Sequence, residues 1–217
     1  MSKYKYILFD MDGTIANTDQ LIIDSMNILY DKYRGGRRTP IEQIYYFSGP
    51  PIADTLKTEF PNMDNDFMVK EFSRVSKELY ASTMTSYPDC REVLLDFKRN
   101  GIKLGVVTNK KREMTIYCLE LLNLEDIFDV VIGYDDVSNG KPNKEGIIKA
   151  LKILEAPDLN EAVYIGDNKI DMETAHNANI DCGLVGWGPR VIPNDVEYTF
   201  KFESFKDLRR IIYESNL

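Results

Sequence analysis

Two aspartates one residue apart, Asp10 and Asp12, follow a short apolar run near the start of the chain. The run from Tyr6 to Phe9 is typical of a buried strand, and Gly13 allows a turn directly after it. Side chains alternate along a strand, but carboxylates two apart can converge on one pocket where the strand ends in a turn. Open α/β sheets keep their chemistry at such strand ends. The segment therefore predicts an α/β fold with an acidic site at the edge of its sheet.

Further strand-like runs alternate with helical patterns after residue 100. The runs are Leu104 to Thr108, Val130 to Gly133, Ala162 to Gly166 and Cys182 to Val185. Apolar residues also recur at helix spacing in three groups: Tyr117, Leu121 and Leu124; Ile147, Leu151 and Leu154; and Phe205, Leu208 and Ile212. Alternating strands and helices predict an α/β fold, a Rossmann-like parallel sheet covered by helices on both faces.

The interval between residues 17 and 85 breaks this alternation. Two series of apolar residues are spaced as on amphipathic helices: Ile22, Met26, Leu29 and Tyr33, and Met68, Phe72, Val75 and Leu79. Between them Ser48-Gly-Pro-Pro51 opens a third helix, with proline in its first turn. We therefore predict an inserted α-helical cap domain at residues 17–85, and a Rossmann-like catalytic core made of residues 1–16 and 86–217.

The composition limits the classes of function. Of the 217 residues, 43% are hydrophobic, which is enough for a core. Asp and Glu number 35 against 27 Lys and Arg, a net charge of -8, and no long basic run occurs, so nucleic-acid binding is disfavoured. The three cysteines are widely spaced, which favours a reducing compartment and no disulfide framework. With no leader pattern and no apolar run of about eighteen residues, we expect a cytoplasmic protein without a membrane segment.

Three further segments place polar groups at or after strand ends. Val106-Val-Thr-Asn109 ends in a hydroxyl that can bind a phosphoryl oxygen, and Gly140-Lys-Pro142 offers a cation for the charge on a transferring group. Gly166-Asp-Asn-Lys-Ile-Asp171 places two carboxylates about one helical turn apart. Acidic oxygen sites of this type suit magnesium. Together with Asp10 and Asp12, these groups indicate phosphoryl transfer.

The four segments, in this order, resemble the signature motifs of the haloacid dehalogenase superfamily, and the resemblance extends from Tyr6 to Gly188. The insertion directly after the first motif resembles the helical cap of the phosphoglycolate phosphatase and β-phosphoglucomutase-like branch. Asp12 stands where the phosphotransfer enzymes of the superfamily carry their second acid, which argues against carbon–halogen hydrolysis. The resemblance implies a phosphatase that works through an aspartyl-phosphate intermediate.

The resemblance also implies roles for the motif residues. Asp10 would be the nucleophile, and Asp12 would protonate the leaving oxygen and then deprotonate the hydrolytic water. Lys141 would pair with Asp10 and with the transferred oxygens, and Thr108 would bind the phosphoryl group. The set expected to contact phosphate consists of Asp10, Gly13, Thr108, Asn109 and Lys141.

The implied cofactor is Mg²⁺. Its ligands would be the Asp10 side chain, the main-chain carbonyl of Asp12 and Asp167, with Asp171 either a further ligand or a residue that holds the others in place. In-line attack on phosphorus places charge on the equatorial oxygens, which this metal and Lys141 would stabilise.

Substrate choice is expected to lie in the cap, because a lid contacts the leaving group and excludes water. The segment from Gly49 to Ile52, with Gly49, Pro50 and Pro51 as its candidate residues, resembles the substrate-facing cap segment of phosphoglycolate-type phosphatases. Four cap cations, Arg34, Arg37, Arg38 and Lys57, offer a charge for a second anionic group, although a solvated face is the simpler interpretation.

The leading hypothesis is a Mg²⁺-dependent phosphatase for a small phosphorylated metabolite, with phosphoglycolate as the first compound to test. A pyrophosphatase and a phosphosugar mutase are alternatives with the same site chemistry. An alternative of another class is a non-catalytic regulator that senses phosphate. The expected partner is a small molecule, with no nucleic acid and no membrane, and the chain is expected to be a monomer or a homodimer.

Overall fold

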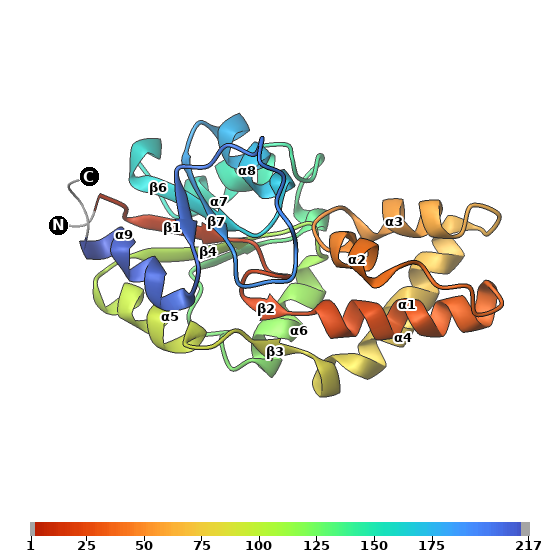
Figure 1. The fold of residues 1–217 in the computed structure, drawn as a ribbon. Coiled ribbons are helices and arrows are strands. Elements are labelled where there is room, and N and C mark those ends of the chain that lie inside the picture. Colours follow the sequence, from red (N-terminus) through yellow and green to blue (C-terminus); the bar gives the residue numbers. More distant parts are fainter. Residues whose placement is uncertain (1–2, 214–217) are drawn as a thin grey trace.

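The computed structural model describes residues 3–213, and its centre is a parallel sheet (Figure 1). The sheet has the strand order β5-β4-β1-β6-β7-β8, and each neighbouring pair runs parallel. Its strands are β1 (Tyr6–Phe9), β4 (Lys103–Val107), β5 (Val130–Ile132), β6 (Ala162–Gly166), β7 (Asp181–Val185) and β8 (Phe200–Phe202). The predicted fold class, an α/β fold with a Rossmann-like parallel sheet, is confirmed.

Helices cover both faces of the sheet. One face packs against α5 (Cys90–Arg99) and α6 (Arg112–Leu121), and the other against α7 (Glu145–Ile153) and α8 (Lys169–Ala178). Asn179 ends α8 in the left-handed conformation (φ 56°), which asparagine tolerates better than most residues. Among residues 3–213, no helix has the length and hydropathy needed to cross a bilayer.

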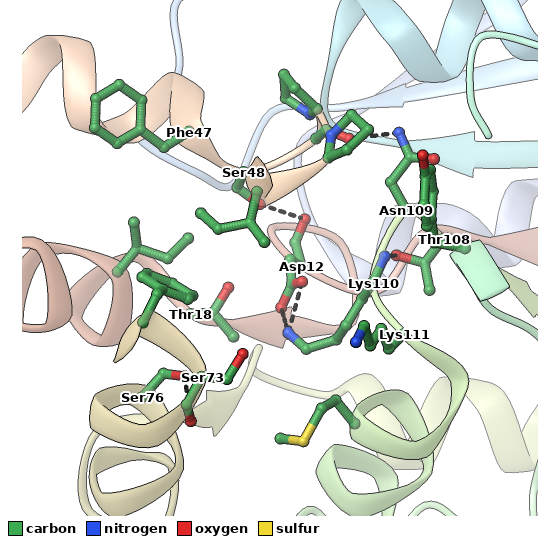
Figure 2. Close-up of a pocket in the computed structure, with 18 of the residues that line it drawn as sticks. Asp12, Thr18, Phe47, Ser48, Ser73, Ser76, Thr108, Asn109, Lys110 and Lys111 are labelled. Atoms are coloured by element: carbon green, nitrogen blue, oxygen red, sulfur yellow. Dashed lines mark hydrogen bonds and ion pairs between the residues drawn. The ribbon is translucent and has the colours of Figure 1, made fainter. Parts of the chain in front are cut away.

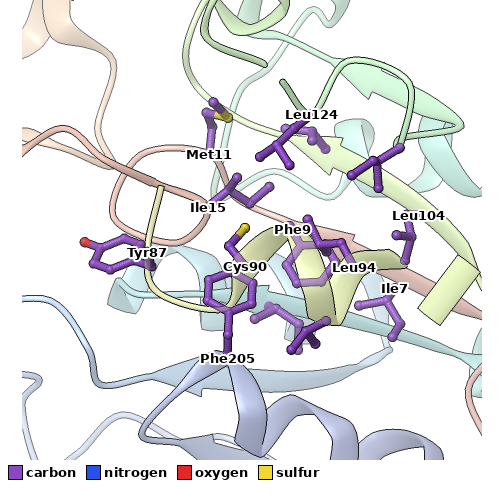
Figure 3. Packing of buried hydrophobic residues seen from close by; sticks show 14 of the residues in the cluster. Ile7, Phe9, Met11, Ile15, Tyr87, Cys90, Leu94, Leu104, Leu124 and Phe205 are labelled. Atoms are coloured by element: carbon purple, nitrogen blue, oxygen red, sulfur yellow. The ribbon is translucent and has the colours of Figure 1, made fainter. Parts of the chain in front are cut away.

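Strand β1 shows how the sequence specifies the two faces. All four of its residues are buried, and successive side chains point to opposite sides of the sheet. Ile7 and Phe9 join the cluster that includes Leu94 of α5 and Phe205 (Figure 3), whereas Tyr6 and Leu8 join the cluster on the face of α7 and α8. A strand buried on both faces reads as a continuous apolar run, which is why this strand is recognisable from sequence.

The four α-helices between β2 and β3 form a segment beside the sheet (Figure 1). We call residues 19–83 the helical segment; its α-helices are α1 (Asp19–Tyr33), α2 (Ile41–Ile44), α3 (Ile52–Glu59) and α4 (Asn65–Thr83). The segment has its own apolar cluster, which includes Met26, Leu56 and Val75. A short antiparallel ribbon of β2 (Ala16–Asn17) and β3 (Thr85–Ser86) lies where the helical segment joins the rest of the chain. The two amphipathic helices predicted by periodicity correspond to α1 and α4.

The structure differs from the sequence prediction near the C-terminus. Strand β8 was not predicted, because three residues are too few for an alternating pattern to be distinguished from a loop. The helix expected from Phe205, Leu208 and Ile212 is a 3₁₀ helix at Phe205–Arg209, followed by α9 (Arg210–Tyr213). Residues three apart share a face in both helix types, so the spacing of Phe205 and Leu208 fits either. The side chain of Ile212 lies outside the described residues.

Candidate active site

The sheet topology brings the predicted site residues to one edge. Asp10 directly follows β1, Thr108 directly follows β4, and Asp167 directly follows β6. These three strands are neighbours in the sheet and run parallel, so their carboxyl ends meet at the same edge. Lys141 lies in the loop between β5 and α7. Four segments that are far apart in the sequence therefore contribute to a single site.

Lys141 is a buried cation between two carboxylates. Its Nζ lies 2.8 Å from Asp10 Oδ1 and 2.6 Å from Asp171 Oδ1, and its side chain is 3% exposed. It also donates a hydrogen bond to the Tyr164 hydroxyl at 3.2 Å. Burial acts to lower the pKa of Lys141, but the charges of Asp10 and Asp171 outweigh burial and raise the pKa well above its usual value. The lysine therefore stays charged beside Asp10.

Asp10, Asp167 and Asp171 form a buried cluster, with one oxygen of each within 4.8 Å of the others. Burial is the main cause of the raised pKa values of two members, about 6 for Asp10 and about 7 for Asp167. Lys141 opposes this effect at Asp10, and Arg190 opposes it at Asp167. The negative charge of the cluster is thus only partly neutralised by the cations of the chain.

The residues fit a divalent cation. When ionised, the three clustered carboxylates and Asp19 carry four negative charges, and the ion pairs of the described residues supply two buried cations, Lys141 and Arg190. Two negative charges are left, which is the charge that a divalent ion neutralises. Carboxylate oxygens are the ligands that magnesium and calcium prefer.

The raised carboxyl pKa values predict how the stability of the metal-free protein depends on pH. The pKa values of Asp10 and Asp167 lie above the ordinary value of 3.8, so both carboxyls take up protons more readily in the folded state than in the unfolded state. Their contribution to stability is therefore complete below about pH 4 and is lost as the pH rises through 6 and 7. In EDTA, the free energy of unfolding should fall as the pH rises from about 4 to about 7, by at most about 1.4 kcal/mol per pH unit for each carboxyl.

Denaturant unfolding in EDTA at several pH values measures this slope. An Asp167→Asn variant should have a shallower slope, because one of the carboxyls with a raised pKa is gone. Acids with lowered pKa values, such as Asp129 and Asp181, titrate at lower pH and do not contribute in this window. A slope that is flat in the wild-type protein would contradict the assignment of raised pKa values to these two aspartates.

Asp171 has a second structural role at the start of α8. Its Oδ2 accepts a hydrogen bond from the Asn168 N–H at 3.0 Å, while the Asn168 side chain caps the helix by accepting from Ile170 N–H. Its Oδ1 accepts hydrogen bonds from Lys141 Nζ and from the Tyr164 hydroxyl. Both oxygens of Asp171 therefore have protein partners, and Asn168 is the N-cap residue of this helix.

Asp12 pairs with a lysine that the sequence analysis did not single out. Lys110 Nζ lies 2.6 Å from Asp12 Oδ1 and donates to Oδ2 at 2.7 Å (Figure 2). Lys110 also lies over the ring of Tyr80, 5.2 Å from its centroid. Burial acts to lower the pKa of Lys110, but Asp12 and Tyr80 raise it well above its usual value. The available sequence signal was its position two residues after Thr108, close to a strand end.

Arg190 is a second buried cation that the sequence analysis missed. It lies in the loop between β7 and β8, and its guanidinium pairs with Asp167 at 2.6 Å and with Asp19 at 2.8 Å. The residue follows a strand end, as the predicted site residues do, but no motif marks it. Gly13 turns the chain beside this pair with a φ of 85°, and a Cβ atom there would lie 2.2 Å from Asp167 Oδ2. Only glycine fits that turn.

Thr108 and Asn109 lie at the same edge. The Thr108 hydroxyl accepts a hydrogen bond from the Lys110 N–H at 3.3 Å, and the residue is 6% exposed. The Asn109 side chain accepts from the Lys141 N–H at 2.8 Å and donates to the Gly49 carbonyl at 2.9 Å. The amide of Asn109 thus connects the loop of Lys141 with the helical segment.

A cavity of about 190 Å³ lies between the sheet edge and the helical segment (Figure 2). Asp10, Asp12 and Thr108 form one side of the cavity, and the predicted cap residues Gly49, Pro50 and Pro51 form part of the other. Most of the remaining wall is apolar. It includes Leu21, Ile22, Phe47, Ile52, Val69, Phe72 and Met114. The two cations in the lining are Lys110 and Lys111.

The cap cations considered in the sequence analysis lie elsewhere. Arg34 pairs with Glu59 at 2.6 Å, and Arg38 pairs with Asp31 at 2.8 Å. Arg37 and Lys57 are exposed, and none of the four lines the cavity. The interpretation as a solvated face agrees with the exposure of Arg37, Arg38 and Lys57, whereas Arg34 is half-buried and lies over the ring of Tyr30.

The fold and the site together define an α/β enzyme whose buried carboxylates and lysines suit phosphoryl transfer. Residues 7–185 match the haloacid dehalogenase-like hydrolase family, and the chain belongs to this family. It is 35% identical to the pyrophosphatase PpaX of Bacillus pumilus over 83% of this chain and 82% of the relative. The family and this relative confirm the predicted class of enzyme, a phosphatase, over the alternative of a non-catalytic regulator.

Solved structures show the same fold. A putative haloacid dehalogenase-like hydrolase from Bacteroides fragilis matches with a TM-score of 0.84 and 24% identity, and the match covers 93% of this chain and 97% of the other. A putative phosphoglycolate phosphatase from Lactobacillus plantarum also has a TM-score of 0.84, with 25% identity and coverage of 98% and 100%. Together with the family match, the Lactobacillus plantarum structure confirms the predicted resemblance to the phosphoglycolate phosphatase and β-phosphoglucomutase-like branch.

Proposed function

We propose that the protein is a Mg²⁺-dependent phosphatase that hydrolyses a small phosphate monoester through an aspartyl phosphate on Asp10. One observation carries the proposal: Asp10, paired with the buried Lys141, and Asp12 lie on the same wall of one cavity. A nucleophile and a proton-transferring group within one cavity are what a two-step displacement at phosphorus requires.

In the proposed reaction, the two aspartates have different chemical roles. Asp10 attacks phosphorus, and the bond between phosphorus and the ester oxygen breaks while Asp12 gives a proton to the departing oxygen. Asp12 then takes a proton from water as the water attacks the aspartyl phosphate, which releases inorganic phosphate and restores Asp10. In the structure Lys110 donates to both oxygens of Asp12. Asp12 therefore has to take up a proton, and turn the protonated oxygen from Lys110 towards the departing oxygen, before it acts as the acid in the first step.

The other motif residues would bind the phosphoryl group and the metal. Lys141 balances the charge of Asp10 and of the transferred oxygens, and Gly13, Thr108 and Asn109 would contact phosphate from the surrounding loops. Mg²⁺ would be held by the carboxylates of Asp10 and Asp167 and by the main-chain carbonyl of Asp12, which here accepts from the Ser48 hydroxyl at 3.4 Å. When bound, the metal would neutralise negative charge on the transferring group.

We propose that residues 17–85 act as a cap on a core made of residues 1–16 and 86–217. Two hydrogen bonds support a closed arrangement: Asn109 donates to the Gly49 carbonyl at 2.9 Å, and Asn168 donates to the Ser48 carbonyl at 3.1 Å. Both donors lie beside residues of the proposed site. Gly49, Pro50 and Pro51 would contact the leaving group, and closure would exclude water from the aspartyl phosphate.

The proposed substrates carry a second anionic group beside the transferred phosphate. Lys110 and Lys111 line the cavity and would face such a group, while the apolar walls leave room only for a small leaving group. Phosphoglycolate is the first compound to test. Pyrophosphate is the second, and the similarity to proteins named pyrophosphatase PpaX favours it.

A phosphate-release screen over about a hundred small phosphorylated compounds, with and without Mg²⁺, tests the proposed function, because substrate choice depends on the shape of the cavity wall. Turnover that does not depend on Mg²⁺, or that persists in an Asp10→Asn variant, would refute the mechanism. A phosphosugar mutase would instead form an isomerised sugar phosphate, which is detected by analysing the products.

An Asp12→Asn variant should separate the two chemical steps. With an alkyl phosphate, kcat/KM should fall by about 10³-fold, because the poor leaving group departs without a proton. With an activated aryl phosphate, the first step should be largely spared, so a rapid burst of phenol is followed by slow turnover. Stopped-flow absorbance measures the burst. Equal losses on both substrates would count against the acid role of Asp12.

A further inference from the structure

Arg190 joins the carboxylate cluster to the helical segment. Its Nη1 lies 2.6 Å from Asp167 Oδ2 and its Nη2 lies 2.8 Å from Asp19 Oδ1, and its side chain is 2% exposed. Asp19 is the first residue of α1. Burial acts to lower the pKa of Arg190, but the charges of Asp167 and Asp19 raise it. The guanidinium is therefore a fixed positive charge inside the site.

Both carboxylate oxygens of Asp167 already have partners within the protein. Asp167 Oδ1 accepts from the Thr14 hydroxyl at 3.2 Å, and Oδ2 faces Arg190 at 2.6 Å. The pair is packed against the turn at Gly13, where a Cβ atom would lie 2.7 Å from Arg190 Nη1. A divalent cation at Asp167 would share this carboxylate with Arg190 and would also be repelled by its charge, because like charges at close range in a buried site are poorly screened.

We propose that Arg190 is a positioning residue that weakens metal binding at Asp167 and makes metal affinity depend on the placement of α1. The inference rests on the proposed function, since it takes Asp167 as a metal ligand. Asp19 draws Arg190 towards α1 and balances part of its charge. If α1 moved away, Arg190 would retain Asp167 as its partner and would compete more strongly with the metal. A closed helical segment and a bound metal therefore favour each other.

Variants of the two partners should shift metal affinity in opposite directions. Arg190→Met removes the competing charge, so Mg²⁺ and Mn²⁺ should bind about tenfold more tightly. Asp19→Asn removes the partner that balances the guanidinium, so both ions should bind several-fold more weakly. Arg190→Lys keeps the charge and should stay within about threefold of the wild-type affinity. Without metal, Arg190→Met should melt at a lower temperature than the wild type, because Asp167 loses its partner, and should gain more stability when metal is added.

Titration of the metal-free full-length protein measures these affinities directly, with calorimetry for Mg²⁺ and electron paramagnetic resonance of free ions for Mn²⁺. Weaker or unchanged binding by Arg190→Met would overturn the inference, because a residue that only orients Asp167 would lower the affinity when removed. If that variant does not fold, unchanged or tighter binding by Asp19→Asn overturns it. Asp167→Asn is the control for the proposed function: if it binds metal as well as the wild type, the proposed metal site itself is wrong.

Discussion

Replacing Asp10 with asparagine is expected to lower kcat by about 10⁴-fold or more, because the amide does not attack phosphorus and no aspartyl phosphate forms. The fold should persist. Asparagine has nearly the volume of aspartate, and burial already favours a neutral group at this position by raising the pKa of Asp10 to about 6. Steady-state phosphate release at saturating substrate measures the loss, and circular dichroism checks the fold.

The intermediate provides a second measurement of the same prediction. After acid quenching during turnover, mass spectrometry of the peptide containing Asp10 should detect a phosphoryl group in the wild-type protein and none in Asp10→Asn. Asp66, an exposed acid of α4, provides the matched control, and Asp66→Asn should retain full activity and the trapped phosphoryl group. A phosphoryl group trapped on another residue would show that Asp10 is not the nucleophile.

Replacing Lys141 with methionine is expected to affect both activity and stability. Activity should fall by about 10³-fold, because the charge beside Asp10 and the transferred oxygens is lost. Asp10 and Asp171 would each lose a buried cation at less than 3 Å, so the free energy of unfolding should fall by about 3–5 kcal/mol at pH 8. The loss of stability should be smaller near pH 5, where Asp10, with a pKa of about 6, is protonated.

Denaturant unfolding at the two pH values distinguishes this effect from a simple packing defect, which would be the same at both. Lys152 lies exposed on α7, and Lys152→Met serves as the control for adding a methionine. A Lys141→Met protein with wild-type stability at pH 8 would show that the buried ion pairs are not the source of stabilisation at this site.

Much of the fold could be predicted because its core strands have strong local patterns. The run Tyr6–Phe9 is buried on both faces, and α1 and α4 keep a helical spacing of apolar residues over several turns. Where the local pattern is short, prediction failed. Strand β8 has three residues and is stabilised by pairing with β7, a contact that no residue of β8 encodes alone.

In the site, too, residues within local motifs could be predicted and residues defined by long-range contacts could not. Asp10, Thr108, Lys141 and Asp167 lie in motifs with regular positions after strands, so the sequence identified them without knowledge of their contacts. Lys110 and Arg190 differ, because their importance comes from the residues they touch: Lys110 contacts an acid 98 positions away, and Arg190 contacts one 171 positions away. Such pairings depend on the distance between side chains in the folded chain, which no local spacing contains.

The sequence by itself determined the class of fold, the order of the four motifs and the two carboxylates at the end of β1, because strand periodicity and turn chemistry act between neighbouring residues. Only the tertiary structure decided how charge is balanced around those carboxylates. The parallel sheet brings Lys141 to Asp10, and the folds of two loops bring Lys110 to Asp12 and Arg190 to Asp167. Electrostatic energy depends on separation and burial in space, so the partners of each acid became evident only in the folded protein.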